Sequence, residues 1–190
     1  MKHKEQALTD EQLAKLVQAG QTEAFGDLVV RYEDKLKRYA RRFLFQLEDQ
    51  EDLVQTVFLK VFENIQGFNT DKRFSPWIYR IAHNEFISTL RKRKFEPLPF
   101  FDPDTLFPHP VAKEKTDADT LLGEQKEVVE KALKDLKPQY REVVILYYFE
   151  DFDYKAIGDI LRIPTSTVGV RLKRAKEKLV TILENNNYTV

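Results

Sequence analysis

Residues 154–179, YKAIGDILRIPTSTVGVRLKRAKEKL, predict a helix, a tight turn and a second helix. Apolar residues recur at helical spacing in the first half. Pro164 interrupts that pattern, because proline lacks the N–H that a helix interior needs. Hydroxyl side chains at 165–167 follow and can cap a new helix. One face of the second helix is apolar and carries Val168, Leu172, Ala175 and Leu179.

The opposite face of this second helix is short and contains cations. It carries Ser166, Val170, Lys173, Arg174 and Glu177. Seven basic residues stand against two acidic ones across residues 154–179, although the formal net charge of the chain is +0. A local positive excess on such a helix is expected of a helix-turn-helix that enters the major groove of DNA. The alternative is an ordinary helical hairpin with a solvated basic face.

The whole chain is long enough for one large or two small domains, since it has 190 residues of which 42% are hydrophobic. It contains no cysteine, which excludes disulfide and thiolate chemistry and fits a reducing compartment. The N-terminal residues lack the apolar run of a signal peptide, and no stretch has the apolar length of a membrane span. Glycine is scarce and alternating strand patterns are absent, so we expect an all-α, cytoplasmic protein.

Three amphipathic helices are predicted in the N-terminal part. A capped helix spans residues 9–19, a second runs from about 22 to 45, and a third carries an apolar stripe from Val54 to Ile65. One face of the third helix is polar with a single exposed apolar residue. It consists of Asp52, Gln55, Thr56 and Leu59. We interpret it as an ordinary surface, with partner binding as the minority alternative.

A basic helix is predicted within residues 68–94, with Ser75 as its cap and Pro76 at its first position. Ala82, Phe86 and Leu90 are its expected core residues. A second line turns from aromatic to polar to cationic along Trp77, Ile81, Asn84, Ser88 and Arg91. Aromatic rings interleaved with cations suit single-stranded nucleic acid, whose bases stack on rings while its phosphates meet Lys or Arg. In the alternative, Trp77 and Phe86 fill the core and the basic run merely ends the helix.

Residues 95–119 differ in composition from both flanks. They contain five prolines, and six acidic residues against two lysines. This composition predicts a flexible linker between two small helical domains, extended in its proline part and by default an inert spacer. Helical periodicity resumes over 120–136, and Pro138 opens another apolar helix before the helix-turn-helix. We therefore expect domains at 1–94 and 120–190.

Three stretches together resemble the extracytoplasmic-function sigma factors of bacterial RNA polymerase. DLVQTVFLKVF resembles the region-two helix that binds the polymerase β′ clamp, and RFSPWIYRIAHNEFISTLRKRK resembles the helix that opens the −10 element. Residues 136–179 resemble region four, which binds the −35 element and the β flap. The order and spacing of the three make the match specific, and the resemblance covers nearly the whole chain.

The resemblance implies site residues in both domains. Asp52 and Gln55 match clamp-contacting positions, Thr56 stands where the family usually has glutamate, and Leu59 lies on the same face. Phe68 and Asn84 match positions near the flipped base of the −10 strand, and the alternative for Phe68 is that it fills the core together with Trp77. The full set of expected strand contacts is Phe68, Lys72, Arg73, Trp77, Arg80, Asn84, Ser88 and Arg91.

The recognition helix departs from the family pattern at two positions. Gly169 replaces a usual cation and Val170 a usual hydroxyl residue, so two polar contacts are missing. We expect base reading to fall more on Thr167, Lys173 and Arg174, and the −35 sequence to be atypical. The expected −35 contacts are Ser166, Thr167, Gly169, Val170, Arg171, Lys173 and Arg174.

The sequence is thus interpreted as an alternative sigma factor, an initiation subunit and not an enzyme. Core RNA polymerase and promoter DNA are the expected partners, an anti-sigma factor is a further one that the resemblance implies, and no cofactor or metal is expected. His3, His83 and His109 are too scattered for a usual metal site. A free-standing helix-turn-helix repressor remains an alternative. A third alternative is a nuclease or helicase accessory protein. Such a protein would need acidic metal clusters or a phosphate-binding loop, and the sequence shows neither.

Overall fold

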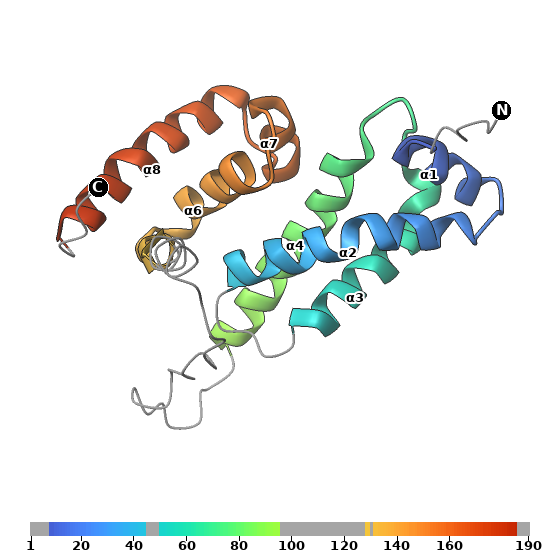
Figure 1. Cartoon of the computed structure of the whole chain (residues 1–190), viewed down its shortest axis with the longest axis horizontal. Helices are drawn as coiled ribbons and strands as arrows, with labels where there is room; N and C mark the ends of the chain where they lie inside the picture. The colour runs from blue at the N-terminus through green and yellow to red at the C-terminus, as the bar shows by residue number, and fades with distance from the viewer. Residues whose placement is uncertain (1–7, 45–49, 96–127, 130, 186–190) are drawn as a thin grey trace, which may run out of the picture.

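The computed structural model describes residues 8–44, 50–95, 128–129 and 131–185. Every regular element within these ranges is helical, as predicted (Figure 1). The N-terminal part contains α1 (Asp10–Gln18), α2 (Ala24–Leu44), α3 (Gln50–Asn64), the short 3-10 helix η1 (Ile65–Gly67) and α4 (Phe74–Phe95). The C-terminal part contains α6 (Pro138–Val144), the π-helical segment η3 (Ile145–Phe149), α7 (Tyr154–Leu161) and α8 (Thr165–Asn185).

Helix α1 begins at a capping box, as its sequence predicted. The Thr9 hydroxyl accepts a hydrogen bond from the Gln12 backbone N–H (3.3 Å), and the Gln12 side chain accepts one from the Thr9 N–H (2.8 Å). Asp10 then joins α1 to α2, because its carboxylate pairs with Arg31 at 2.7 Å and accepts the Tyr32 hydroxyl at 2.5 Å. These contacts fix the first two helices of the N-terminal domain against each other.

The core of the N-terminal domain is largely aromatic. The fully buried Tyr39 ring lies 5.8 Å from Phe43, 5.2 Å from Tyr79 and 5.4 Å from Phe86. Its hydroxyl is 3.1 Å from Nδ1 of His83 on α4. Burial lowers the pKa of His83 to about 4, so this imidazole is neutral near pH 7. His83 is therefore a core residue.

Helix α4 starts two residues earlier than predicted, at Phe74 and not at Pro76. Phe74 is its first residue, so Ser75 lies inside the helix and does not cap it, and Pro76 is its third residue. The Phe74 N–H donates to the side chain of Glu11 at 2.9 Å. The Glu11 carboxylate of α1 thus accepts a backbone N–H at the start of α4. The sequence had predicted that the Ser75 hydroxyl would cap this helix.

The C-terminal domain contains the predicted helix-turn-helix. Asp153 caps α7 by accepting the Ala156 N–H at 2.7 Å, and α7 ends where Arg162 adopts the left-handed conformation (φ 54°). The Gly158 carbonyl accepts hydrogen bonds from the N–H groups of Arg162 and Ile163. Pro138 opens α6, as predicted. Phe95, the first residue of the predicted linker, is instead the last residue of α4. The rest of the predicted linker and most of the predicted helix at 120–136 lie outside the described residues.

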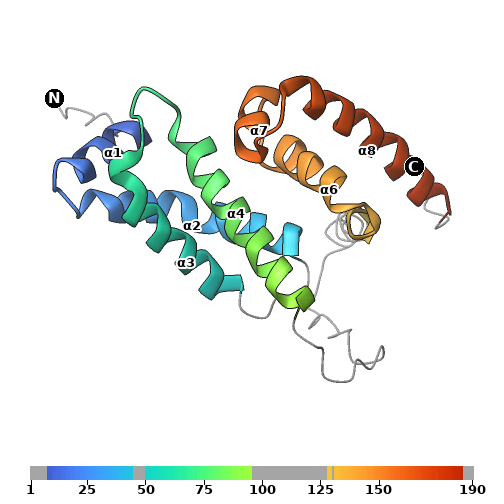
Figure 2. The ribbon, with the colours of Figure 1, turned by 180° about the vertical axis from the view of Figure 1, so that it is seen from behind.

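The two domains pack against each other in this structure. Helix α7 lies alongside α4, and opposite views of the ribbon agree on this arrangement (Figures 1 and 2). Tyr79 of α4 meets the buried Phe152 ring edge-on, at a centroid distance of 4.8 Å. The sequence indicated two domains on a tether but gave no sign that they touch, because helical periodicity shows which face is covered and not what covers it.

Candidate nucleic-acid interface

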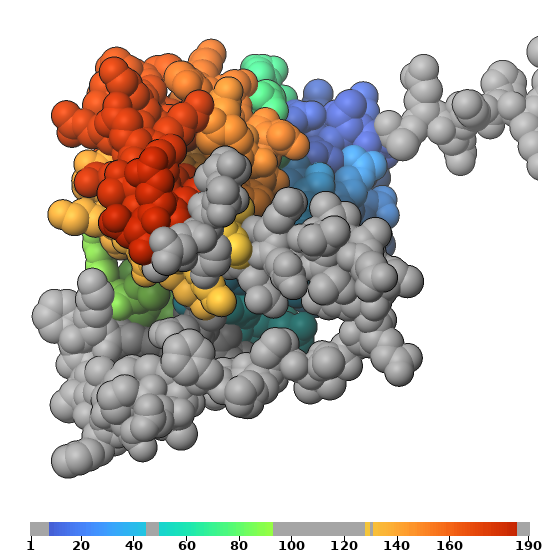
Figure 3. Space-filling view, turned by 60° about the vertical axis from the view of Figure 1, so that its left-hand side comes forward, coloured from blue at the N-terminus to red at the C-terminus, as the bar shows by residue number. Residues whose placement is uncertain are grey.

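The recognition helix α8 has the two faces that its sequence predicted. Its buried residues are Val168, Leu172 and Ala175, whereas Ser166, Lys173 and Arg174 are exposed. In the space-filling view α8 forms an outer surface of the molecule (Figure 3). Four of the predicted −35 contacts are exposed (Ser166, Val170, Lys173 and Arg174), while Thr167, Gly169 and Arg171 are half-buried.

Arg171 is engaged inside the protein. Its guanidinium donates to a Glu142 oxygen at 2.7 Å, and Glu142 is a buried residue of α6. Burial raises the pKa of Glu142 to about 7, although Arg171 acts in the opposite direction. The other Glu142 oxygen lies 3.8 Å from Nε2 of His83 on α4. Glu142 was not among the predicted site residues, because an acid inside an apolar helical stretch gives no local signal.

Gly169 faces an aromatic ring. A Cβ atom built at this position would lie 3.5 Å from Cε2 of Tyr154, the first residue of α7. Tyr154 is 40% exposed, and its ring lies 5.4 Å from the Tyr147 ring. Where the family pattern has a cation, this chain therefore has a small residue packed beside tyrosine. Val170, next along the helix, is 50% exposed.

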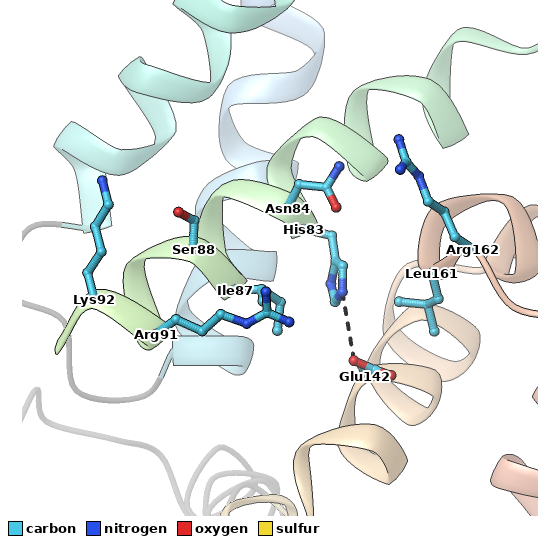
Figure 4. Close-up of a pocket in the computed structure, with 9 residues that line it drawn as sticks. All are labelled: His83, Asn84, Ile87, Ser88, Arg91, Lys92, Glu142, Leu161 and Arg162. Atoms are coloured by element: carbon cyan, nitrogen blue, oxygen red, sulfur yellow. Dashed lines mark ion pairs between the residues drawn. The ribbon is translucent and has the colours of Figure 1, made fainter. Parts of the chain in front are cut away.

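The polar line of α4 faces the helix-turn-helix domain. Asn84, Ser88 and Arg91 line a cavity of about 880 Å³ whose other wall includes Glu142 and Arg162 (Figure 4). The structure thus brings part of the expected −10 surface close to the turn of the expected −35 reader. Arg162 was not among the predicted contacts, although it belongs to the basic excess of residues 154–179.

Phe68 and Trp77 pack together. Phe68 is only 5% exposed, and its ring lies 4.9 Å from Trp77 and 5.3 Å from Phe74. The Gln18 side chain donates to the Phe68 carbonyl at 2.8 Å, which holds the start of the loop between η1 and α4 in place. For Phe68 the structure therefore favours the core alternative in this conformation. Trp77 is half-buried and borders a second cavity, of about 700 Å³, with Lys72, Arg73 and Arg80.

The outer face of α3 is polar around one apolar residue. Asp52 and Gln55 are exposed, and Leu59 is 66% exposed. Thr56 is half-buried, and its hydroxyl donates to the Asp52 carbonyl at 2.9 Å. Its hydrogen is committed to its own helix, so Thr56 offers a partner less than a glutamate would.

No group of three or more histidine, cysteine or acidic side chains is arranged for a metal ion among the residues that the structure describes. The described helices also include none long and apolar enough to cross a bilayer.

Two family models match the chain. The model for sigma-70 region 2 matches residues 28–96, and the model for sigma-70 region 4 matches residues 126–179. The chain is 32% identical over 173 residues to the ECF RNA polymerase sigma factor SigW of Bacillus subtilis, covering 87% of this chain and 91% of SigW. It is 28% identical over 178 residues to the ECF RNA polymerase sigma-E factor of Escherichia coli, covering 90% and 93%.

Two solved structures have folds similar to that of this chain. The structure of CnrH in complex with the cytosolic domain of CnrY has a TM-score of 0.69 and 26% identity, covering 94% of this chain and 99% of that one. The sigma factor RpoE of Bartonella quintana, solved with the anti-sigma factor NepR, shares the fold with a TM-score of 0.66, 24% identity and coverage of 84% and 96%. The chain belongs to the extracytoplasmic-function family of RNA polymerase sigma factors, the promoter-recognising initiation factors.

Proposed function

We propose that this sigma factor divides promoter recognition between its two domains. Helix α8 reads the −35 element as duplex DNA, and α4 holds the unpaired −10 strand. The observation that carries this proposal is that one chain combines a helix-turn-helix with an exposed basic face and a separate cationic helix bearing an aromatic and an amide. These lie in the order of region 2 and region 4 along the chain.

In the −35 complex, Lys173 and Arg174 are the expected principal contacts. Both are exposed on α8 and belong to the same short face as Ser166 and Val170. Arginine pairs well with guanine in the major groove, and the Val170 side chain can touch a thymine methyl group. Thr167, Gly169 and Arg171 lie nearer the protein interior. Their contacts with DNA then depend on how closely α8 enters the groove.

In the −10 complex, Asn84 is the expected partner of an unpaired base edge. It is exposed on α4 between Arg80 and Ser88, with Arg91 one turn further on. The partly exposed Trp77 offers a ring for stacking, which is worth about 1–3 kcal/mol per base. Lys72 and Arg73 are exposed in the preceding loop and are expected to meet phosphates. A role of Phe68 requires its ring to leave its present packing.

Docking on core polymerase is assigned to the outer face of α3. Its exposed Leu59 with Asp52 and Gln55 makes an apolar centre with a polar rim, a composition typical of interfaces, and Thr56 contributes little. We further propose domain boundaries at 1–94 and 120–190 with a linker at 95–119, action in the cytoplasm, and no catalytic activity. An anti-sigma partner also stays a prediction.

Run-off transcription with purified core polymerase tests the function. A promoter-dependent transcript should appear only when this chain is added to core polymerase. A helix-turn-helix repressor would instead bind a symmetric site tightly without core polymerase and yield no transcript. The second result would remove the initiation role and leave the repressor.

A further inference from the structure

Arg171 lies toward the inner side of the recognition helix α8. The residues three before it and four after it, Val168 and Ala175, are both 0% exposed. Residues at these spacings share one side of an α-helix, so Arg171 leaves the helix on the side that packs against the protein. The exposed Lys173 is two residues further on, which places it on the far side of the helix from Arg171.

The side chain of Arg171 also runs inward. An arginine at the edge of a buried face can extend its long stem and keep its charge in water. Here the guanidinium instead donates at 2.7 Å to a carboxylate oxygen of Glu142, a residue of α6 that is 8% exposed. Arg171 is therefore bonded inside the protein, whereas Lys173 and Arg174 are exposed.

Glu142 depends on this bond. A buried carboxylate is costly unless it is paired and hydrogen-bonded. The second oxygen of Glu142 lies 3.8 Å from Nε2 of His83 on α4 (Figure 4), which is longer than a hydrogen bond, and that buried imidazole is neutral near pH 7. Among the residues that the structure describes, Arg171 is thus the partner that satisfies Glu142.

The residue before Glu142 anchors α6 at its other side. The Arg141 guanidinium donates to three backbone carbonyl groups at the end of the preceding helical segment, those of Leu133 (2.8 Å), Lys134 (2.7 Å) and Leu136 (3.0 Å). Carbonyl groups at the end of a helix lack partners within that helix, so these bonds satisfy them. Arg141 therefore fixes α6 to the segment before it, and Glu142 fixes α6 to α8.

We propose that Glu142 is a positioning residue for promoter recognition: its bond to Arg171 sets the orientation of α8 on α6, and Arg171 supports the reading face without contacting a base. This inference rests on the proposed role of α8 at the −35 element, and it removes Arg171 from the base contacts expected from the sequence. Reading then falls to the exposed residues of the helix, Ser166, Val170, Lys173 and Arg174.

The two roles open to Arg171 predict opposite effects of removing the Glu142 carboxylate. If Glu142 positions α8, its loss loosens the helix and lowers the affinity for the −35 element, because less of the protein is then in the binding-competent orientation. If Glu142 instead withholds a base-reading arginine from DNA, its loss releases Arg171 and raises the affinity. Glu142→Met makes this test, since methionine is flexible and offers the guanidinium no strong acceptor.

The experiment uses core polymerase assembled with the full chain. A promoter library randomised across the −35 element gives the preference at each position, and titration of the preferred promoter gives the affinity. Glu142→Met and Arg171→Met should each lower the affinity about tenfold, the effect of losing one charged hydrogen bond, and keep the wild-type preference at every position. Glu142→Gln keeps an oxygen that can accept the Arg171 N–H and should bind within about twofold of wild type.

Val143→Ala is the matched control. It truncates a buried neighbour of Glu142 on α6 and leaves the pair with Arg171 intact, so it should lower stability but keep the −35 affinity of the folded chain. Where circular dichroism shows that a single variant is unfolded, the double variant Glu142→Met, Arg171→Met replaces it, because exchanging both partners of a buried pair for apolar residues is often neutral. The double variant should keep every preference and bind no more weakly than either single variant.

Several results would overturn the proposal. One is a preference lost at a single −35 position in Arg171→Met or in the double variant, which would make Arg171 a reader. Others are a Glu142→Met chain that binds as tightly as wild type or more tightly, a Glu142→Gln chain as weak as Glu142→Met, and an equal loss of affinity in Val143→Ala. Failure of the proposed function looks different, because the wild-type chain would then select no −35 sequence with core polymerase.

Discussion

Gly158 should tolerate no side chain, and the reason lies in the turn of the helix-turn-helix. A Cβ atom at this position would lie 2.9 Å from the Ile163 carbonyl oxygen, which is a backbone atom and cannot rotate away. The Gly158 carbonyl also accepts the N–H groups of Arg162 and Ile163, the latter at 3.1 Å. Gly158→Ala must therefore push the turn outward and disturb the bonds that end α7.

The expected magnitude follows from three contributions. Overpacking of a well-packed site costs about 1–3 kcal/mol. Weakening one hydrogen bond at the turn adds about 1 kcal/mol, and the better helix propensity of alanine returns about 1 kcal/mol. The free energy of unfolding should therefore fall by about 1–3 kcal/mol, and the affinity for a −35 duplex should fall with it because α8 starts from this turn.

A second glycine provides the matched control. A Cβ atom at Gly169 meets only the Tyr154 ring, at the ordinary contact distance of 3.5 Å. Gly169→Ala should therefore raise the free energy of unfolding by up to about 1 kcal/mol. Urea unfolding of the full chain, followed by circular dichroism, measures both variants. A neutral or stabilising Gly158→Ala would refute the account of the turn.

Three further predictions concern contacts, linker and charge. Arg174→Ala should cost about 1–3 kcal/mol of −35 binding and relax preference at one position; a promoter-library profile identical to wild type would remove Arg174 from the readers. Shortening the 95–119 linker by several residues should lower promoter-dependent initiation and spare core binding, and unchanged initiation would exclude a spacer role. Burial raises the pKa of Glu142 from 4.5 to about 7 in the folded chain. The contribution of Glu142 protonation to the free energy of unfolding is therefore complete below pH 4.5 and is lost as the pH rises through 7. Glu142→Gln should thus gain stability relative to wild type by up to about 3 kcal/mol over this window, and parallel stability profiles for the two proteins would contradict this.

Local sequence signals were sufficient to predict the helices and their faces. Three of the four apolar residues predicted for the inner face of α8 are buried and Leu179 is half-buried, and the Thr9–Gln12 capping box starts α1. Pro164 lies just before the first residue of α8. These features depend on periodicity, proline and capping, which act within a few residues and can be read without a partner.

Contacts across the domain boundary could not be predicted in the same way. The pairing of Arg171 with Glu142 joins residues of two helices, and the bond between Tyr79 and Glu150 joins two domains. Phe68 could be assigned to the core or to a DNA contact until its burial against Trp77 was seen. Sequence spacing fixes the face of a helix on which a residue lies, whereas tertiary packing decides whether that residue is available to a ligand.

Promoter opening with Asn84→Ala tests the central claim most directly. Permanganate reactivity of thymines in the −10 region should appear on a duplex promoter when core polymerase and the wild-type chain are both present. Asn84→Ala should fold, bind core polymerase normally and open the duplex less, because the exposed amide is lost without a large cavity. The defect should shrink on a template already mismatched across the −10 region. Opening by Asn84→Ala at the wild-type rate would contradict the role of α4 in strand separation.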